Sequence, residues 1–464
     1  TEDIYFADAS EIAERIRTKS LSPVEVVRAH LDRIEQVNPK INAVVTLADD
    51  ALEQARDAEK AVARGELRGP LHGVPFTAKD CFDTQGVKTT RGSRIFADLV
   101  PQIDATAVHR LKKAGGILLG KTNLPEFALS GETSNRVFDR TFNPWNRERT
   151  SGGSSGGEAA AISSGLSPLG IGTDLGGSNR LPAHYCGIVG FKPTHGCIPL
   201  SGSWPSLMCR HMHVGPLARS VRDAALAFSV MSGPDGLDPY ALSWPLRQPG
   251  EWSGELNGLR VGCFQKGPFT PVAREIQETV ERAASTLEAM GCLIEPVDFA
   301  WHDRFAIDIC MDMVVTEVSH YLKPFIEGRE HELSGSIQRL LALPEPALKD
   351  FLESMDKRDL IAQDMVQFFD QYDLLLCPTA PNLAHGHDAE KLIIDGQEVK
   401  PSHAANITAT FGLTGSPAIS IPFGRSQESM PIGIQLVARH YDEATLFHAT
   451  MALEATDRPN RPSV

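Results

Sequence analysis

The feature that most constrains the fold is an alternation of short apolar runs with helical patterns. Helical periodicity is clear in residues 105–114, 221–231 and 273–290. Because buried strands alternate with helices in this way in layered proteins, we predict an α/β architecture with a largely buried, mostly parallel sheet. The apolar runs of strand length are residues 74–78, 117–120, 169–172, 188–191, 259–263, 374–377, 418–422 and 432–437.

The chain has 464 residues and no linker or composition break that divides it. We therefore expect one α/β domain, although chains of this length often hold two or three domains. Four segments of that domain are predicted: a helical wrap (1–65), a catalytic core (70–230), a variable insert or cap (232–370) and a C-terminal part of the core (371–464).

Composition and charge exclude several classes of function. The formal net charge is −14 and no basic run is present, so a nucleic-acid partner is not expected. No apolar stretch reaches the ~18 residues of a membrane span, and the first residues lack a signal-peptide pattern. The eight cysteines are scattered without a CxxC pair, which argues against a zinc site or a disulfide framework. We expect a cytoplasmic protein with reduced thiols and no cofactor, metal or membrane partner.

Two motif matches are misleading in their context. Residues 115–122 read GGILLGKT and fit the P-loop pattern, but a helical pattern precedes them and an apolar strand lies inside the supposed loop. The pairs His211 with His213 and His385 with His387 lack the further ligands that a metal site needs. We expect neither nucleotide binding nor a metal centre from these segments.

The glycine-rich stretch from residue 150 to 194 is the strongest candidate for chemistry. Ser178 follows Leu175, Gly176 and Gly177, and the glycines allow successive backbone N–H groups to turn inward as an anion nest. We therefore predict a nucleophile at Ser178 and an oxyanion hole formed by the backbone of residues 175–178. The nucleophile still needs a base.

Lys79 is a candidate for that base. It ends an apolar run, and a buried lysine has its charged form disfavoured and its pKa lowered. Lysines at strand ends often extend to water instead, so this segment alone leaves both interpretations open. A second alternative is a nucleophile elbow at residues 152–156, with Ser154 as the nucleophile of a Ser-His-Asp α/β-hydrolase; the polar stretch before it argues against that arrangement.

Four segments together resemble the amidase signature family: HGVPFTAKD, GGSSGGEAAA, GTDLGGSNR and GFKPTHG. Members of this family use a Ser-cisSer-Lys triad. Ser178 lies 24 positions after Ser154, which matches the separation of the two family serines. The resemblance therefore implies Ser178 as nucleophile, Ser154 as bridging serine after a cis peptide bond, and Lys79 as general base.

The resemblance extends over nearly the whole chain and implies a single domain around a large mixed sheet. It also implies that Ser155, Asp174 and Arg180 support the geometry of the triad. Asn179 is a departure, because the family most often has an apolar residue there.

The expected substrate is a small-molecule amide. In the family, the stretch that corresponds to Ala128, Leu129 and Ser130 borders the acyl pocket; with Thr173 it carries no charge here, which favours an apolar or aromatic acyl or amine group. Anilides, carbamates and esters present a carbonyl to the same oxyanion hole, so the resemblance includes urethanase or esterase side activity.

One branch of the family works within the multi-chain glutamyl-tRNA amidotransferase. This chain departs from that branch in the segment CRHMHVGPLARSVRD and in the GGE that follows the first serine pair. We therefore expect a free-standing amidase, and the alternative is an amidotransferase-type subunit. A homodimer is left open as the assembly.

Overall fold

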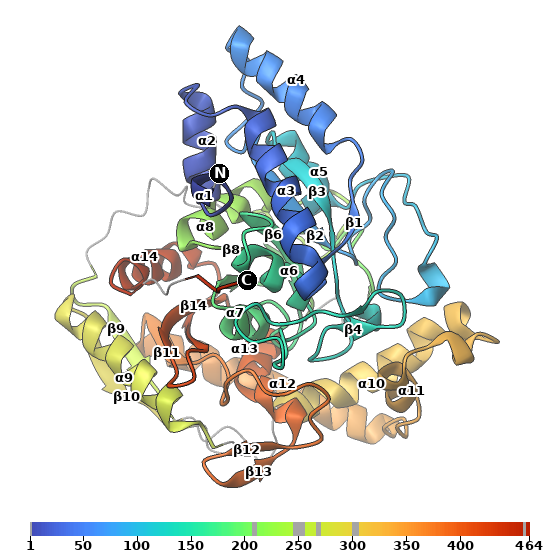
Figure 1. Cartoon of the computed structure of the whole chain (residues 1–464). Coiled ribbons are helices and arrows are strands. Elements are labelled where there is room, and N and C mark those ends of the chain that lie inside the picture. Colours follow the sequence, from blue (N-terminus) through green and yellow to red (C-terminus); the bar gives the residue numbers. More distant parts are fainter. Residues whose placement is uncertain (1, 207–210, 245–255, 266–270, 299–305, 458–460) are drawn as a thin grey trace.

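The computed structural model describes residues 2–206, 211–244, 256–265, 271–298, 306–457 and 461–464. Its core is an 11-stranded sheet in which strands far apart in the sequence are neighbours (Figure 1). In spatial order the strands are β1 (Val44–Leu47), β3 (Ile117–Thr122), β2 (Pro75–Lys79), β6 (Leu169–Asp174), β8 (His213–Ala218), β7 (Val189–Lys192), β14 (Ala418–Arg425), β15 (Pro431–Ala438), β11 (Leu374–Pro378), β9 (Arg260–Cys263) and β10 (Leu293–Pro296).

The predicted α/β architecture with a large mixed sheet is confirmed, and each of the eight predicted runs forms a strand of it. Strands β1, β8 and β10 were not predicted. Strand β8 reads HVGPLA, and its glycine, proline and histidine conceal a strand whose six residues are all buried.

The expectation of a mostly parallel sheet is wrong. Parallel pairs occur only near the two ends, in β3–β2–β6 and in β11–β9–β10. The pairs from β6 through β8, β7, β14 and β15 to β11 are antiparallel, as is the edge pair β1–β3. All eight residues of β15 are nonetheless buried, so helices cover both faces of the antiparallel centre as well. A continuous apolar run therefore indicates that both faces of a strand are buried, but it does not indicate whether the strand is parallel or antiparallel to its neighbours.

Amphipathic helices cover the β1–β3 side of the sheet (Figure 1). The longest of them, α3 (Pro23–Ile41), begins with a capping box: Ser22 Oγ accepts from the Val24 and Glu25 N–H groups, and Glu25 accepts from the Ser22 N–H. The other N-terminal helices are α1 (Glu2–Tyr5), α2 (Ala9–Arg17), α4 (Ala51–Arg64) and α5 (Thr106–Lys113).

Further helices pack around the sheet centre and its β9–β10 end. They are α6 (Gly156–Ser163), α7 (Arg180–Cys186), α8 (Val221–Met231), α9 (Arg274–Ala289), α13 (Asn406–Thr414) and α14 (Glu443–Glu454). Two small hairpins, β4 (Ser134–Asn135) with β5 (Asp139–Arg140) and β12 (Leu392–Ile394) with β13 (Gln397–Val399), lie outside the main sheet.

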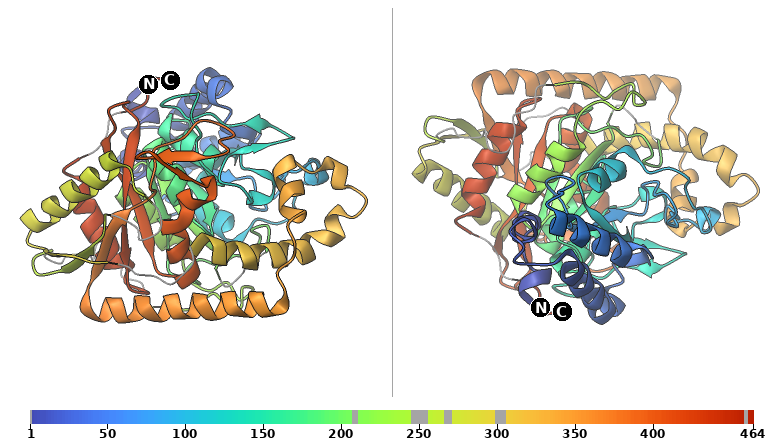
Figure 2. Two further views of the ribbon diagram at one scale, coloured as in Figure 1. Left: turned by 90° about the horizontal axis from the view of Figure 1, so that it is seen from below. Right: turned by 90° about the horizontal axis from the view of Figure 1, so that it is seen from above.

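A group of three helices packs beside α13 (Figure 2). They are α10 (Ala306–Ile326), α11 (Gly335–Leu341) and α12 (Leu348–Gln371). Because residues 232–370 also supply β9, α9 and β10, that segment contributes both to the main sheet and to this helical group; the proposed division of the chain stays a prediction. None of the described helices is long and apolar enough to span a membrane.

Candidate active site

Lys79 lies at the end of β2, inside the protein. Its side chain is fully buried, and Nζ donates to Ser154 Oγ at 2.7 Å and to Thr173 Oγ1 at 2.9 Å. Because β2 and β6 are parallel neighbours, their carboxyl ends bring Lys79 and Thr173 to the same edge of the sheet. Burial lowers the pKa of Lys79 to about 8, although nearby acidic groups oppose this shift. At mildly basic pH a larger share of this amine is therefore uncharged than in an ordinary lysine.

Ser154 lies in the turn before α6. The Gly153–Ser154 peptide bond is cis, as the resemblance implies, and the serine side chain is buried against Lys79. In the described structure no strand leads directly into Ser154, and the hydrogen-bond partner of its hydroxyl is a lysine and not a histidine. The nucleophile-elbow alternative requires both of the missing features, so the geometry argues against it.

The turn that carries Ser178 follows β6 and is fixed by Asp174. The carboxylate accepts from the Gly177 N–H at 2.8 Å and the Asn179 N–H at 3.2 Å. It also forms a bidentate ion pair with the guanidinium of Arg180, at 2.9 and 2.8 Å. Burial raises the pKa of Asp174, but Arg180 and the N–H donors outweigh it and the net shift is downward. Asp174 and Arg180 thus hold the turn without reaching the pocket.

The backbone around Ser178 offers hydrogen-bond donors to the pocket. Ser178 is partly exposed there, and within the described chain the N–H groups of Leu175, Gly176 and Ser178 have no hydrogen-bond partner. The Gly177 N–H is already bound to Asp174. The four donors expected from the sequence therefore narrow to three that are free to bind an oxyanion.

Ser155 and Asn179 connect the two turns. Ser155 Oγ donates to Asn179 Oδ1 at 3.0 Å, and the Ser155 N–H donates to the Ser178 carbonyl at 3.1 Å. The Asn179 amide donates in turn to backbone carbonyls of Phe191 and Gly215. The departure at Asn179 therefore has a structural role, because an apolar side chain would leave these buried groups without their partners.

One contact and one residue were missed by sequence reasoning. Thr173 was predicted to line the pocket, which it does, but its hydroxyl also binds Lys79. Glu158 is fully buried in the first turn of α6, where the hydroxyls of Thr77 and Thr122 donate to its carboxylate. Burial raises the pKa of Glu158 to about 7. Its position in GGE next to the serine pair was a usable signal, because glutamate is seldom buried without a role.

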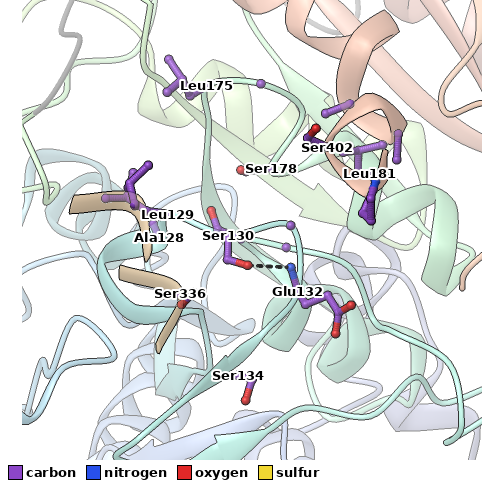
Figure 3. Close-up of a pocket in the computed structure, with 18 of the residues that line it drawn as sticks. Ala128, Leu129, Ser130, Glu132, Ser134, Leu175, Ser178, Leu181, Ser336 and Ser402 are labelled. Carbon is purple, nitrogen blue, oxygen red and sulfur yellow. Dashed lines mark hydrogen bonds between the residues drawn. The ribbon is translucent and has the colours of Figure 1, made fainter. Parts of the chain in front are cut away.

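A pocket of about 1130 Å³ opens above the turns (Figure 3). Ala128, Leu129 and Ser130 lie on its wall, as predicted, together with Thr173. Both apolar and polar residues line the pocket. The apolar residues include Leu175, Met212, Ile307, Cys310, Met311 and Val314, and the polar ones include Glu132, Arg136, Ser336, Arg339, His385, Asp388 and Glu390.

The P-loop-like segment and the histidine pairs have other roles in the structure. Lys121, which would be the P-loop lysine, lies buried inside β3 and donates to Thr84 and Thr89 hydroxyls at 2.9 Å each. His211 contacts Arg358, and the ring of His213 lies 3.1 Å from the Asp174 carbonyl. Of the eight cysteines, Cys209 lies outside the described residues, and the seven described ones are buried and form no disulfide.

The comparisons with known proteins agree with this geometry. A family model described as Amidase matches residues 25–447. A curated relative from Moorella thermoacetica, one of the subunits of its glutamyl-tRNA(Gln) amidotransferase, is 35% identical over 99% of this chain and 98% of that protein.

Solved structures agree as well. A bacterial aryl acylamidase of the amidase signature family is 29% identical with a TM-score of 0.89, over 97% of this chain and 96% of that one. The 6-aminohexanoate cyclic dimer hydrolase is 29% identical with a TM-score of 0.86, over 99% of both chains. The chain therefore belongs to the amidase signature family and is an amide hydrolase that acts on C–N bonds other than peptide bonds.

Proposed function

We propose that the protein is a free-standing amidase that hydrolyses a small carboxylic amide through Lys79, Ser154 and Ser178. The observation that carries the proposal is the buried contact of 2.7 Å between Lys79 Nζ and Ser154 Oγ, next to a partly exposed Ser178 in the pocket. A lysine with a lowered pKa can act as a general base, and the side chains that Lys79 contacts are Ser154 and Thr173, so Ser154 is the group that can relay a proton from Ser178 to it.

In the proposed reaction, neutral Lys79 takes the proton of Ser154 while Ser154 takes that of Ser178. Ser178 Oγ attacks the amide carbonyl, and the oxyanion binds the free N–H groups of Leu175, Gly176 and Ser178. When the C–N bond breaks, the proton returns through Ser154 to the leaving amine. Water then hydrolyses the acyl-enzyme through the same relay, releasing the acid.

The proposed acyl group is apolar and uncharged. The side chains of Leu175, Ile307, Cys310 and Val314 form an apolar part of the pocket beside the Gly176 backbone; a Cβ added to Gly176 would lie 3.6 Å from Ile307 Cδ1. A charged acyl group would lose its hydration there without gaining a partner. Anilides, carbamates and esters with such acyl groups are further substrates under this proposal.

The second candidate is an amidotransferase-type subunit. It is favoured by the 35% identity to the amidotransferase chain of Moorella thermoacetica over almost the whole length of both proteins. Glutamine, as the ammonia donor of such an enzyme, carries an ammonium and a carboxylate, and the pocket lining includes both acidic and basic side chains. The free-standing amidase is the preferred proposal because the chain departs from the amidotransferase branch in the segment CRHMHVGPLARSVRD and in the GGE after the first serine pair.

A substrate panel tests the two candidates directly. The purified chain is assayed alone with glutamine and with primary amides, anilides, carbamates and esters that share one apolar acyl group. We expect hydrolysis of apolar amides and no release of ammonia from glutamine, with Ser178→Ala inactive throughout. Ammonia from glutamine without turnover of any apolar substrate would overturn the proposal in favour of the amidotransferase-type subunit.

A further inference from the structure

Glu132 presents an incompletely used carboxylate at the edge of the pocket. Its side chain is 20% exposed and lies between two histidines that are 14% and 15% exposed. His385 Nδ1 is 3.7 Å from Glu132 Oε1, and His387 Nδ1 is 4.0 Å from Oε2. Both distances are longer than a hydrogen bond.

The two histidines use their N–H groups elsewhere. His385 Nδ1 lies 2.8 Å from a neighbouring backbone carbonyl and His387 Nε2 lies 2.9 Å from another. Carbonyls only accept, so these nitrogens carry the hydrogens, and neither neutral ring donates to Glu132. Within the described chain, the carboxylate accepts one hydrogen bond, from the Asp388 N–H at 3.3 Å. A carboxylate can accept about four, so Glu132 retains spare capacity.

The surroundings of Glu132 suit a positive charge. Tyr185 also lines the pocket and lies edge-on to His385 with centroids 6.1 Å apart, but it is only 2% exposed, so it packs against this end without offering a free ring face. Asp388 and Glu390 border the same end, and Asp388 pairs with Arg140 at 2.6 Å. A carboxylate that keeps part of its acceptor capacity, beside further acidic side chains, attracts an alkylammonium group through its charge.

The arginines that line the pocket lie at or next to helix α11 and not beside residues 385–390. Arg339 belongs to α11, and Arg136 donates to the Leu333 carbonyl just before that helix. The pocket wall therefore carries negative side chains near residues 385–390 and positive ones near α11.

The acidic end lies on the same side as Ser154. A Cβ added to Gly153 would lie 2.8 Å from the Glu132 backbone nitrogen, and one added to Gly152 would lie 3.0 Å from Tyr185 Cδ2. The Gly152–Gly153 turn that carries Ser154 is thus packed between the Tyr185 and Glu132 segments. In the proposed reaction Ser154 returns the proton to the leaving amine, so that amine must lie on this side.

We propose that Glu132 forms a subsite for a cationic leaving group, so that the preferred substrates are amides of an apolar acid with an amine that carries a second, positively charged nitrogen. The proposal rests on the proposed function, because Ser154 assigns the side of the leaving group. It concerns recognition only: Glu132 accepts the cation and takes no part in bond breaking.

Two hexanoyl amides of matched shape test this subsite. One is the amide of aminoethyl-trimethylammonium, whose charge does not change with pH. The other is its neutral carbon isostere, in which a tert-butyl group replaces the trimethylammonium group. Two quantities are measured. The first is the ratio of the kcat/KM values of the two amides with the active protein. The second is the ratio of their Kd values with the Ser178→Ala variant, determined by calorimetry. We expect a preference of about tenfold for the cation, the size of one partly buried charge contact.

The variants assign the preference to its residue. Glu132→Gln should bring both ratios to about one, whereas the matched control Glu148→Gln, which removes an exposed carboxylate away from the pocket lining, should keep them at about ten. A Kd ratio near one in the otherwise unmodified protein, or a preference that survives Glu132→Gln, would overturn the subsite. Absence of turnover with a retained Kd ratio would instead overturn the proposed function, so the two failures are distinguishable.

Discussion

The two sides of the pocket are built in opposite ways. Around the serine turns, polar side chains such as Lys79, Asp174 and Arg180 are fully buried and held by hydrogen bonds from several directions. On the other side, α10 contributes mainly apolar side chains to the pocket, such as Ile307 and Val314, and these belong to an apolar cluster that includes residues of α12. Hydrogen-bond geometry fixes the first region, and apolar packing shapes the second. We therefore expect substitutions in the first region to affect the chemistry and those in the second to affect the choice of substrate.

The largest effect should come from Lys79→Met. Removing the proposed base should lower kcat by about 10³- to 10⁴-fold, because general base catalysis contributes an effect of that size. The fold should persist, since the variant no longer buries an amine. The measurement is steady-state kinetics with circular dichroism as the check on folding.

Lys121→Met is the matched control for that variant, because Lys121 is equally buried but its amine donates to the hydroxyls of Thr84 and Thr89 and to neither serine of the relay. It should lose stability, since Asp80 lies 3.8 Å from its amine and would be left without that charge, yet kcat of the folded fraction should stay within about tenfold of the unmodified enzyme. Near-normal kcat in Lys79→Met would remove the distinction between the two regions.

The next effect should come from Asp174→Asn. This variant leaves the buried guanidinium of Arg180 without its charge partner, which should lower the free energy of unfolding by about 3 to 5 kcal/mol. Denaturant unfolding gives this value. Asp388→Asn is the control, because its ion pair with Arg140 is largely exposed on the carboxylate side and should contribute about 1 kcal/mol or less. Equal losses in the two variants would show that the turn does not depend on its buried ion pair.

A change of pH should act on the first region through Lys79. The pKa of Lys79 is lowered to about 8, so about half of the amine is neutral at pH 8 and about one hundredth at pH 6. Because the proposed base must be neutral, kcat/KM for an uncharged substrate should fall about 50-fold between these values as pH decreases. The pH–rate profile is the measurement, and a rate that rises as pH falls would contradict a lysine base.

The smallest effect should come from the helical region. Val314→Ala on α10 removes two methyl groups from the apolar part of the pocket. It should change the ratio of kcat/KM between long and short acyl groups by about tenfold, the lower end of the range that one methylene gives in an apolar pocket. A loss of kcat for all acyl lengths alike would instead link α10 to the chemistry.

Some features of the fold and of the site could be predicted from the sequence, and others could not. Strand positions could be predicted because buried runs are continuous and apolar, as in β6 and β15, but strand direction could not, because burial on both faces looks the same in parallel and antiparallel strands. The resemblance pointed to Lys79, Ser154 and Ser178 as a set, and the structure brings Lys79 and Ser154 into contact.

Contacts between segments that are distant in the chain could not be predicted from the sequence. One such contact joins Thr173 Oγ1 to Lys79. Another is made by Asn179, which links Ser155 to the Gly215 carbonyl. These positions are close only because of the order of the strands in the sheet. Glu158 was visible as a residue type, but its threonine partners lie on β2 and β3 and required the fold.

The most direct test of the central claim is to map the adduct of a fluorophosphonate by peptide mass spectrometry. The account predicts one modified residue, Ser178, with no adduct in Ser178→Ala and slower labelling in Lys79→Met. An adduct on Ser154 that persists in Ser178→Ala and disappears in Ser154→Ala would contradict the relay and make Ser154 the nucleophile.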